Sequence, residues 1–99
     1  MRLSQKEVEA IQANFEVFFD EGILYLFGSR VDDTKKGGDI DLYITTKNKE
    51  NLVDKKIKFA SRLARVFEYK KVDIVLDYGQ ERLIDKKAKN EGIILCTKY

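Results

Sequence analysis

The sequence predicts an α+β fold: a small β-sheet of three core strands and a short C-terminal strand, with helices packed against it. Short apolar runs of strand length alternate along the chain with segments whose apolar residues recur at the three-and-four spacing of a helix. Glycines stand where several of these segments would end. The chain has 99 residues, which suits one hydrophobic core, so we expect residues 1–99 to form a single domain.

The first expected element is a helix from Ser4 to Glu21. Ser4 followed by Glu7 forms a capping box, in which each side chain bonds to the backbone N–H of the other residue. Gly22 stands where a C-terminal cap would end the helix. One apolar face is predicted from the residues that share helical spacing: Val8, Ile11, Phe15, Phe18 and Phe19.

An apolar run from Ile23 to Phe27 predicts a buried strand, and a turn follows it. Gly28 allows a sharp turn and a close approach to a ligand because it has no Cβ. Ser29 offers a hydroxyl and an amide at the same point, so the turn is a candidate phosphate cradle. Arg30 follows directly and has two interpretations: its guanidinium binds a phosphate, or it forms a surface ion pair with one of the aspartates after it.

Two aspartates open the second expected strand, which runs from Asp39 to Thr45. Asp39 and Asp41 alternate with Ile40 and Leu42, and residues two apart on a strand share a face. Both carboxylates should therefore point one way while the apolar side chains enter the core. A hard divalent cation such as Mg²⁺ prefers oxygen ligands of this kind, often one or two carboxylates together with substrate phosphates. The alternative interpretation is a solvated strand end.

A second helix is expected from Lys49 to Glu68, capped by Asn48 or Asn51. Its other faces are strongly basic, and we interpret it as a surface helix packed on the sheet. Its predicted apolar stripe consists of Leu52, Val53, Ile57, Ala60, Leu63, Ala64 and Phe67.

The third expected strand runs from Lys70 to Asp77. Asp73 is a charged residue inside an otherwise apolar alternation, which makes it a candidate third carboxylate. Asp77 is the competing candidate, although its place at the strand end favours a turn residue.

A short helix from Glu81 to Asn90, bearing Leu83, Ile84 and Ala88, should precede a last strand. Gly92 fits its C-terminal cap, and Ile93 to Cys96 predicts a short strand at an edge or across the end of the sheet.

The amino-acid composition excludes several kinds of chemistry and binding. The chain has no histidine, which excludes histidine ligands and histidine acid–base catalysis. With 19 basic and 17 acidic residues the net charge is only +2, so nucleic-acid binding is not expected, and the lysine pairs, Lys70–Lys71 among them, are interpreted as solvated. The single Cys96, the lack of a signal-peptide pattern and the lack of a long apolar stretch predict a cytoplasmic protein without membrane contact.

Taken together, Gly28–Ser29 after an apolar strand and Asp39–Ile40–Asp41–Leu42 before the next one resemble the signature of the DNA polymerase β-like nucleotidyltransferase superfamily. The short chain is similar to its minimal members, the MNT-type nucleotidyltransferases. This resemblance implies a mixed sheet and assigns Asp39, Asp41 and Asp73 to the catalysis and to the binding of two Mg²⁺ ions. It implies that Gly28 and Ser29 hold the β- and γ-phosphates, with ATP as the favoured substrate.

The resemblance also implies a partner. Minimal members are often paired with a small helical HEPN-type protein in a toxin–antitoxin module, where the nucleotidyltransferase is the antitoxin and attaches AMP to the toxin. Two other functions remain open. The chain is a binding module that acts by contact alone, or it modifies a small molecule of the aminoglycoside type, with a homodimer supplying the acceptor pocket.

Overall fold

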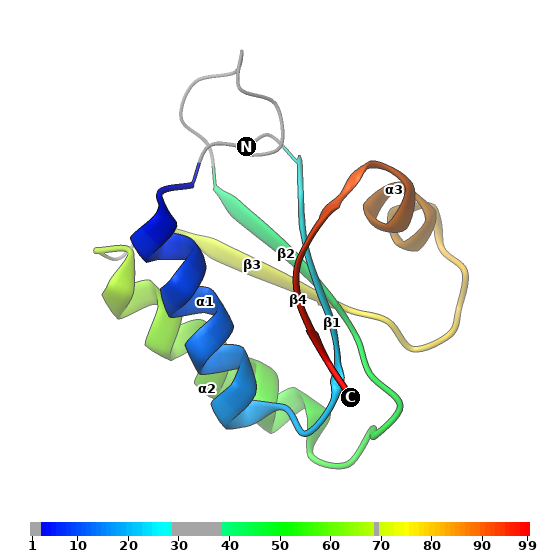
Figure 1. Ribbon diagram of the computed structural model, residues 1–99. Helices are drawn as coiled ribbons and strands as arrows, with labels where there is room; N and C mark the ends of the chain where they lie inside the picture. The colour runs from blue at the N-terminus through cyan, green and yellow to red at the C-terminus, as the bar shows by residue number, and fades with distance from the viewer. Residues whose placement is uncertain (1–2, 29–38, 69) are drawn as a thin grey trace.

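Figure 1 shows the computed structural model, which describes residues 3–28, 39–68 and 70–99. Its element order is α1 (Gln5–Phe18), β1 (Gly22–Phe27), β2 (Ile40–Thr45), α2 (Leu52–Val66), β3 (Val72–Leu76), α3 (Leu83–Glu91) and β4 (Ile93–Lys98). The sheet has the order β3-β2-β1-β4. β1 is antiparallel to both β2 and β4, whereas β2 and β3 are parallel, so the expected mixed sheet is confirmed.

The helices lie on both faces of the sheet. α1 and α2 pack against each other on one face, and α3 lies on the opposite face (Figure 1). No helix in the described ranges is long and apolar enough to span a membrane. Within the part of the chain that the structure describes, three helices surround one four-stranded sheet, which is an α+β arrangement.

The capping box of the first helix is confirmed. The Ser4 hydroxyl accepts from the Glu7 amide at 3.1 Å, and the Ser4 amide donates to the Glu7 carboxylate at 2.8 Å. The predicted end of this helix is wrong, because α1 stops at Phe18 and Gly22 is the first residue of β1. Gly22 has a φ of +141°, and a Cβ there would collide with the carbonyl oxygen of Thr45 on the paired strand. A glycine is therefore required at position 22, because the paired strand leaves no room for a Cβ.

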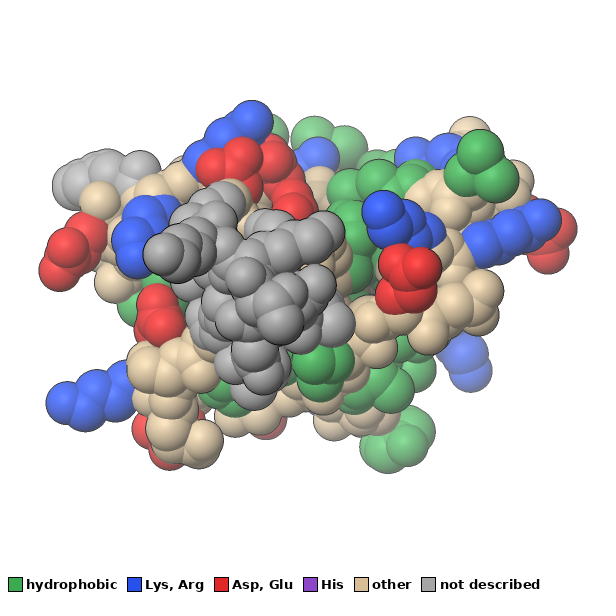
Figure 2. Space-filling model, turned by 90° about the horizontal axis from the view of Figure 1, so that it is seen from above, with side chains coloured by type: hydrophobic (Ala, Val, Ile, Leu, Met, Phe, Trp, Pro, Cys, Tyr) green, Lys and Arg blue, Asp and Glu red, His purple; other side chains and the backbone are tan. Residues whose placement is uncertain are grey.

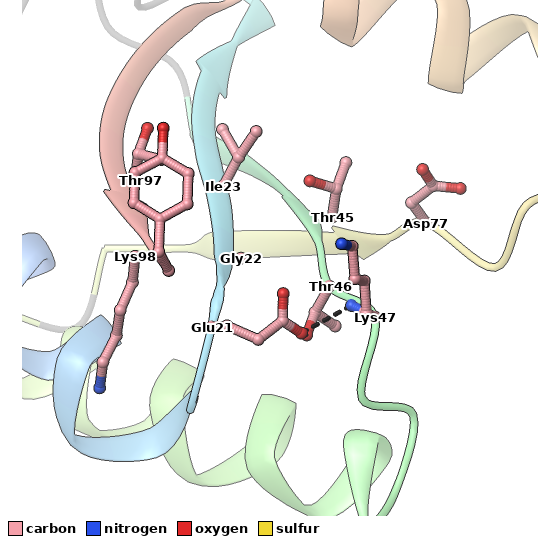
Figure 3. Close-up of a pocket in the computed structure, with 10 residues that line it drawn as sticks. Glu21, Gly22, Ile23, Thr45, Thr46, Lys47, Asp77, Thr97 and Lys98 are labelled. Atoms are coloured by element: carbon pink, nitrogen blue, oxygen red, sulfur yellow. Dashed lines mark hydrogen bonds between the residues drawn. The ribbon is translucent and has the colours of Figure 1, made fainter.

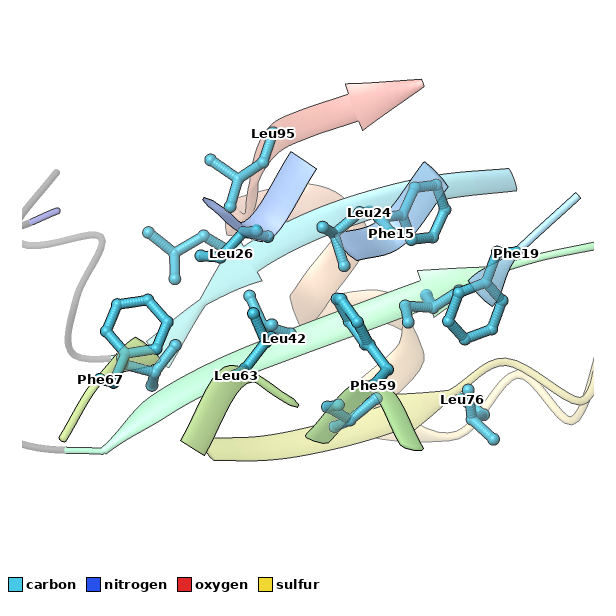
Figure 4. Packing of buried hydrophobic residues seen from close by; sticks show 14 of the residues in the cluster. Phe15, Phe19, Leu24, Leu26, Leu42, Phe59, Leu63, Phe67, Leu76 and Leu95 are labelled. Carbon is cyan, nitrogen blue, oxygen red and sulfur yellow. The ribbon is translucent and has the colours of Figure 1, made fainter. Parts of the chain in front are cut away.

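The predicted apolar stripe of the second helix is partly wrong. Val53 and Ile57 are 59% and 57% exposed, whereas Phe59, absent from that stripe, is fully buried. The ring of Phe59 lies edge-on to the rings of Phe15 and Phe19, with centroid distances of 6.3 and 5.7 Å (Figure 4). Compared with the predicted stripe, the helix is rotated about its axis. Leu52, Phe59, Leu63 and the following Phe67 face the main core, which is the hydrophobic cluster between α1, α2 and the sheet. A basic helix with apolar residues on more than one side does not reveal by spacing alone which side is buried.

The cap of this helix also differs from the expectation. Asn51 occupies the N-cap position, but it has a left-handed backbone and its side chain makes no capping bond. The Asn48 side chain instead accepts from the Glu50 amide at 3.0 Å within the preceding turn.

The last elements lie where they are expected, with small shifts in their bounds. Gly92 follows α3 and donates its amide to the carbonyl of Ala88 at 2.8 Å, which confirms the C-cap. β4 is an edge strand, and it continues to Lys98 rather than ending at Cys96. Cys96 is half-buried in it, and this burial raises the pKa of its thiol.

A second, smaller cluster joins α3 to the sheet. It contains Phe27, Tyr43 and Ala88. The Tyr43 hydroxyl donates to the buried Asp85 carboxylate at 2.6 Å, and the Arg82 guanidinium donates to the same carboxylate at 2.9 and 3.1 Å. These contacts hold α3 over the face of the sheet that also carries the predicted carboxylates.

Candidate active site

Gly28 ends β1 beside the second aspartate. Phe27, the last residue of β1, is the register partner of Asp41 on β2. Gly28 has a φ of +77°, in the left-handed region that favours glycine. A Cβ at this position would lie 2.5 Å from the Asp41 carboxylate oxygen Oδ2, so only glycine lets the chain turn this close to the carboxylate. Ser29 and Arg30, the other predicted phosphate-binding residues, lie outside the described residues.

Asp41 and Asp73 stand directly opposite each other on the parallel strands β2 and β3. Residues in register have side chains on the same face, so the two carboxylates emerge side by side. Their strand neighbours Ile40, Leu42 and Ile74 are buried on the other face, as the alternation predicts. Asp39 precedes β2 and lies close to the same group, with 49% of its side chain exposed.

Lys71 connects these carboxylates and was not predicted to do so. Its ammonium lies 3.8 Å from Asp39 Oδ2 and 3.7 Å from Asp73 Oδ2. From the sequence it was interpreted as one of a solvated lysine pair. The available signal is its place two residues before Asp73, which predicts the same strand face. Seen from above, acidic and basic side chains stand together over this end of the molecule (Figure 2).

The electrostatics of the cluster favour a bound cation. Burial raises the pKa of the Asp41 carboxyl, and the nearby charges of Asp73 and Asp39 raise it further, while Lys71 acts in the opposite direction. A carboxylate with a raised pKa is one whose charge is unfavourable in its surroundings. An added positive charge would relieve that cost.

The donor chemistry fits Mg²⁺, although a closed cage is not preformed. Across the described ranges, no three acidic, cysteine or histidine side chains are grouped so that they could hold a metal ion. Asp39, Asp41 and Asp73 nevertheless offer hard oxygen ligands in one neighbourhood, and Mg²⁺ is usually held by few carboxylates together with substrate phosphates.

A pocket of about 540 Å³ opens beside the carboxylates. Asp41 and Asp73 line it together with Gly28, and it continues along β3 between α2 and α3. Lys56 and Ala60 contribute from α2, while Ile84 and Lys87 contribute from α3. The candidate site thus combines a cluster of charged side chains with an adjacent pocket.

A second pocket, of about 520 Å³, lies at the opposite end of the sheet (Figure 3). There the Glu21 carboxylate accepts from the Thr46 hydroxyl and from the amides of Lys47 and Asn48, and these bonds lower its pKa. Asp77, the competing candidate for the third carboxylate, lines this pocket. Its carboxylate is bonded to Lys89 and to the Gly79 amide, so it is a turn residue away from Asp41.

Comparisons with known proteins identify the family of this domain. The family model described as "Polymerase beta, Nucleotidyltransferase" matches residues 9–99. This chain therefore belongs to the polymerase beta nucleotidyltransferase family, and its domain is a nucleotidyltransferase domain. No curated protein matches the sequence.

Three solved structures with the same fold come from toxin–antitoxin systems. One contains a tri-AMPylated HEPN toxin with an MNT antitoxin from Shewanella oneidensis; the likeness has a TM-score of 0.75 at 18% identity and covers 97% of this chain and 74% of that one. A mutant MntA–HpeT complex gives a TM-score of 0.76 at 16% identity, covering 92% and 73%. A toxin–antitoxin structure with AMP-PNP gives 0.76 at 19% identity, with the same coverage. At these identities the likeness shows the fold.

Proposed function

We propose that this protein is a Mg²⁺-dependent nucleotidyltransferase that transfers AMP from ATP to a hydroxyl group of a small HEPN-type partner protein, as the antitoxin of a cytoplasmic toxin–antitoxin pair. The observation that carries the proposal is the register pairing of Asp41 with Asp73 beside Gly28, in a chain of the nucleotidyltransferase family. The similar structures support the choice of acceptor and nucleotide, since one contains an AMPylated toxin and another AMP-PNP.

In this mechanism the three aspartates form the charged centre. Asp39 and Asp41 hold the metal ions, and Asp73 completes the site or accepts the proton of the attacking hydroxyl. Bound Mg²⁺ supplies charge neutralisation for the attacking oxygen, the phosphates and the leaving group. The turn at Gly28 and Ser29, with Arg30 after it, holds the β- and γ-phosphates.

The reaction is a substitution at the α-phosphorus of ATP. The acceptor oxygen forms a bond to that phosphorus, the bond to the oxygen bridging to the β-phosphate breaks, and pyrophosphate leaves. The hydroxyl proton passes to a carboxylate or to solvent.

Labelling with ATP that carries a radioactive α-phosphate tests the proposal. The protein, Mg²⁺ and labelled ATP are added to a lysate of the source cells, with Asp41→Asn as the control. We expect one labelled protein band that the control does not produce. Label on a small molecule would favour the aminoglycoside-type function. A partner bound equally by the native protein and Asp41→Asn without any label would indicate action by contact alone.

A further inference from the structure

The outer edge of β3 lies beside the candidate active site, and no described strand covers it. β3 is the last strand on one side of the sheet, and within the described residues it pairs only with β2. The Ile40 amide donates to the Lys71 carbonyl, and the Asp77 amide donates to the Ile44 carbonyl, both at 3.0 Å. In a parallel ladder alternate residues bond to opposite sides, so the backbone groups of Val72 and Ile74 point outward.

This open edge is short and is closed at one end. The Leu76 carbonyl also points outward, but it accepts from the Arg82 guanidinium at 2.7 Å. With respect to the described residues, the stretch of this edge without a partner therefore runs from Val72 to Val75, next to Asp41 and Asp73. The same four consecutive residues line the pocket of about 540 Å³, so the hollow follows the strand edge.

The two sides of this edge carry positive charge. Lys56 of α2 lines one side of the pocket, and Lys87 of α3 lines the other. Ile84, which is 36% exposed, adds an apolar contact on the α3 side. An extended chain is able to pair with an unpaired strand edge through its own backbone while neighbouring side-chain sites select its residues.

We propose that an extended acidic segment of the acceptor protein pairs with the outer edge of β3 and presents its reacting hydroxyl opposite Asp73. The identity of this segment as the acceptor rests on the proposed function. Because the backbone of Asp73 bonds inward, the residue opposite it in an antiparallel strand forms a non-hydrogen-bonded pair, the type in which side chains approach most closely. Such neighbours have Cβ atoms about 5 Å apart, so a hydroxyl there reaches the carboxylates.

The register also specifies the rest of the segment. Residues two positions from the hydroxyl lie on the same face, opposite Lys71 and Val75. An acidic residue fits the first and an apolar residue the second. Residues on the other face lie opposite Val72 and Ile74, toward Lys56, where an acidic residue is again favoured.

Amide hydrogen exchange tests the docking directly. The probe is a capped nine-residue peptide with one central threonine, a glutamate on each side of it, a further glutamate two positions after it, a valine two positions before it and alanine elsewhere. It is added to the whole chain with AMP-PNP and Mg²⁺. We expect the amides of Val72 and Ile74 to exchange quickly in the free protein and to be protected by the peptide. The amides of Asp73 and Val75 should be protected throughout. A peptide with lysine in place of every glutamate is the control and should bind more weakly.

Two kinds of variant distinguish backbone pairing with the edge of β3 from attraction by the lysine side chains. Val72→Pro removes an outward amide at the first position of an edge strand, where proline is tolerated, and should abolish peptide binding. Lys56→Glu with Lys87→Glu should weaken binding about tenfold, since each reversal replaces attraction with repulsion. The matched control is Lys58→Glu with Lys86→Glu, which makes the same charge change on the same helices outside the pocket lining.

The outcomes distinguish this docking from the proposed function. Protection of Val72 and Ile74 without transfer of labelled AMP to any acceptor would support the docking and contradict the function. Transfer to a protein acceptor that is unaffected by Val72→Pro and by both reversals would overturn the docking alone. Absence of protection at millimolar peptide would also overturn the docking.

Discussion

Asp41 and Asp73 are register partners on two parallel strands, and the backbone ladder between β2 and β3 sets their side chains next to each other. Their placement therefore depends on the sheet and not on a loop. The burial of Asp41 and the negative charges around it raise its pKa, so a positive charge nearby would stabilise the ionised carboxylates. Lys71 provides part of this positive charge, and the proposed Mg²⁺ ions would provide more during catalysis.

Gly28→Ala should remove activity by displacing the Asp41 carboxylate. The added Cβ would lie 2.5 Å from Asp41 Oδ2, and the backbone φ of +77° is unfavourable for alanine. Gly79→Ala is the matched control, because Gly79 has a φ of +78° and nothing lies within 4 Å of its missing Cβ. Both variants should lose about 1–2 kcal/mol of unfolding free energy in urea denaturation. Only Gly28→Ala should lose AMP transfer; equal activity in the two would contradict the role of Gly28.

Lys71→Met should strengthen Mg²⁺ binding by up to about fivefold, because the ammonium competes with a metal ion for Asp39 and Asp73. Isothermal titration calorimetry with Mg²⁺ measures this in the absence of nucleotide. Lys70→Met is the control: Lys70 is exposed and makes no ion pair with any residue that the structure describes. Weaker binding in Lys71→Met than in Lys70→Met would show that the ammonium supports the metal site.

The rotation of α2 is tested by truncating two of its side chains. Phe59→Ala should cost about 3–5 kcal/mol of unfolding free energy, since Phe59 is fully buried against two other rings. Ile57→Ala on the same helix should change it by less than about 1 kcal/mol, because Ile57 is 57% exposed. Urea denaturation followed by circular dichroism compares the two. Similar losses in both would mean that the helix face is assigned wrongly.

Asp85→Asn should lower stability at neutral pH and have a smaller effect in acid. The bonds from Arg82 and Tyr43 hold the pKa of this buried carboxyl well below its usual value of 3.8. The charged form is therefore favoured by folding, and its stabilisation is present above the usual pKa and is lost as pH falls toward the lowered one. Between pH 7 and about pH 3, the difference between the melting temperatures of the two proteins should stay constant at first and begin to narrow as the pH falls below 3.8. A constant difference across that range would contradict this assignment.

The strand alternation in the sequence correctly predicted which face of the sheet carries the Asp41 and Asp73 side chains. Asp41 and Asp73 each interrupt an apolar run, and a period of two leaves one arrangement in which the apolar residues are all buried. Gly28 was identifiable by a different signal, since it directly follows an apolar run and precedes polar sequence.

Other features depend on contacts between residues that are distant in sequence, so local spacing alone did not determine them. The buried side of α2 is chosen by Phe15 and Phe19 of another helix, so its own pattern did not exclude Val53 and Ile57. The contact of Lys71 with Asp39 requires β2 and β3 to be adjacent and parallel. The bond from Tyr43 to Asp85 likewise arises only when α3 folds back over the sheet.

The most direct test of the central claim compares two forms of labelled ATP with the purified protein, Mg²⁺ and its partner protein. Nucleotidyl transfer at the pair of Asp41 and Asp73 predicts that label from the α-phosphate becomes attached to the partner, while label from the γ-phosphate is released as pyrophosphate. Asp41→Asn should reduce this transfer by about 100-fold or more, as loss of a charge that stabilises the transition state does elsewhere. Attachment of the γ-label, or full transfer by Asp41→Asn, would contradict the account.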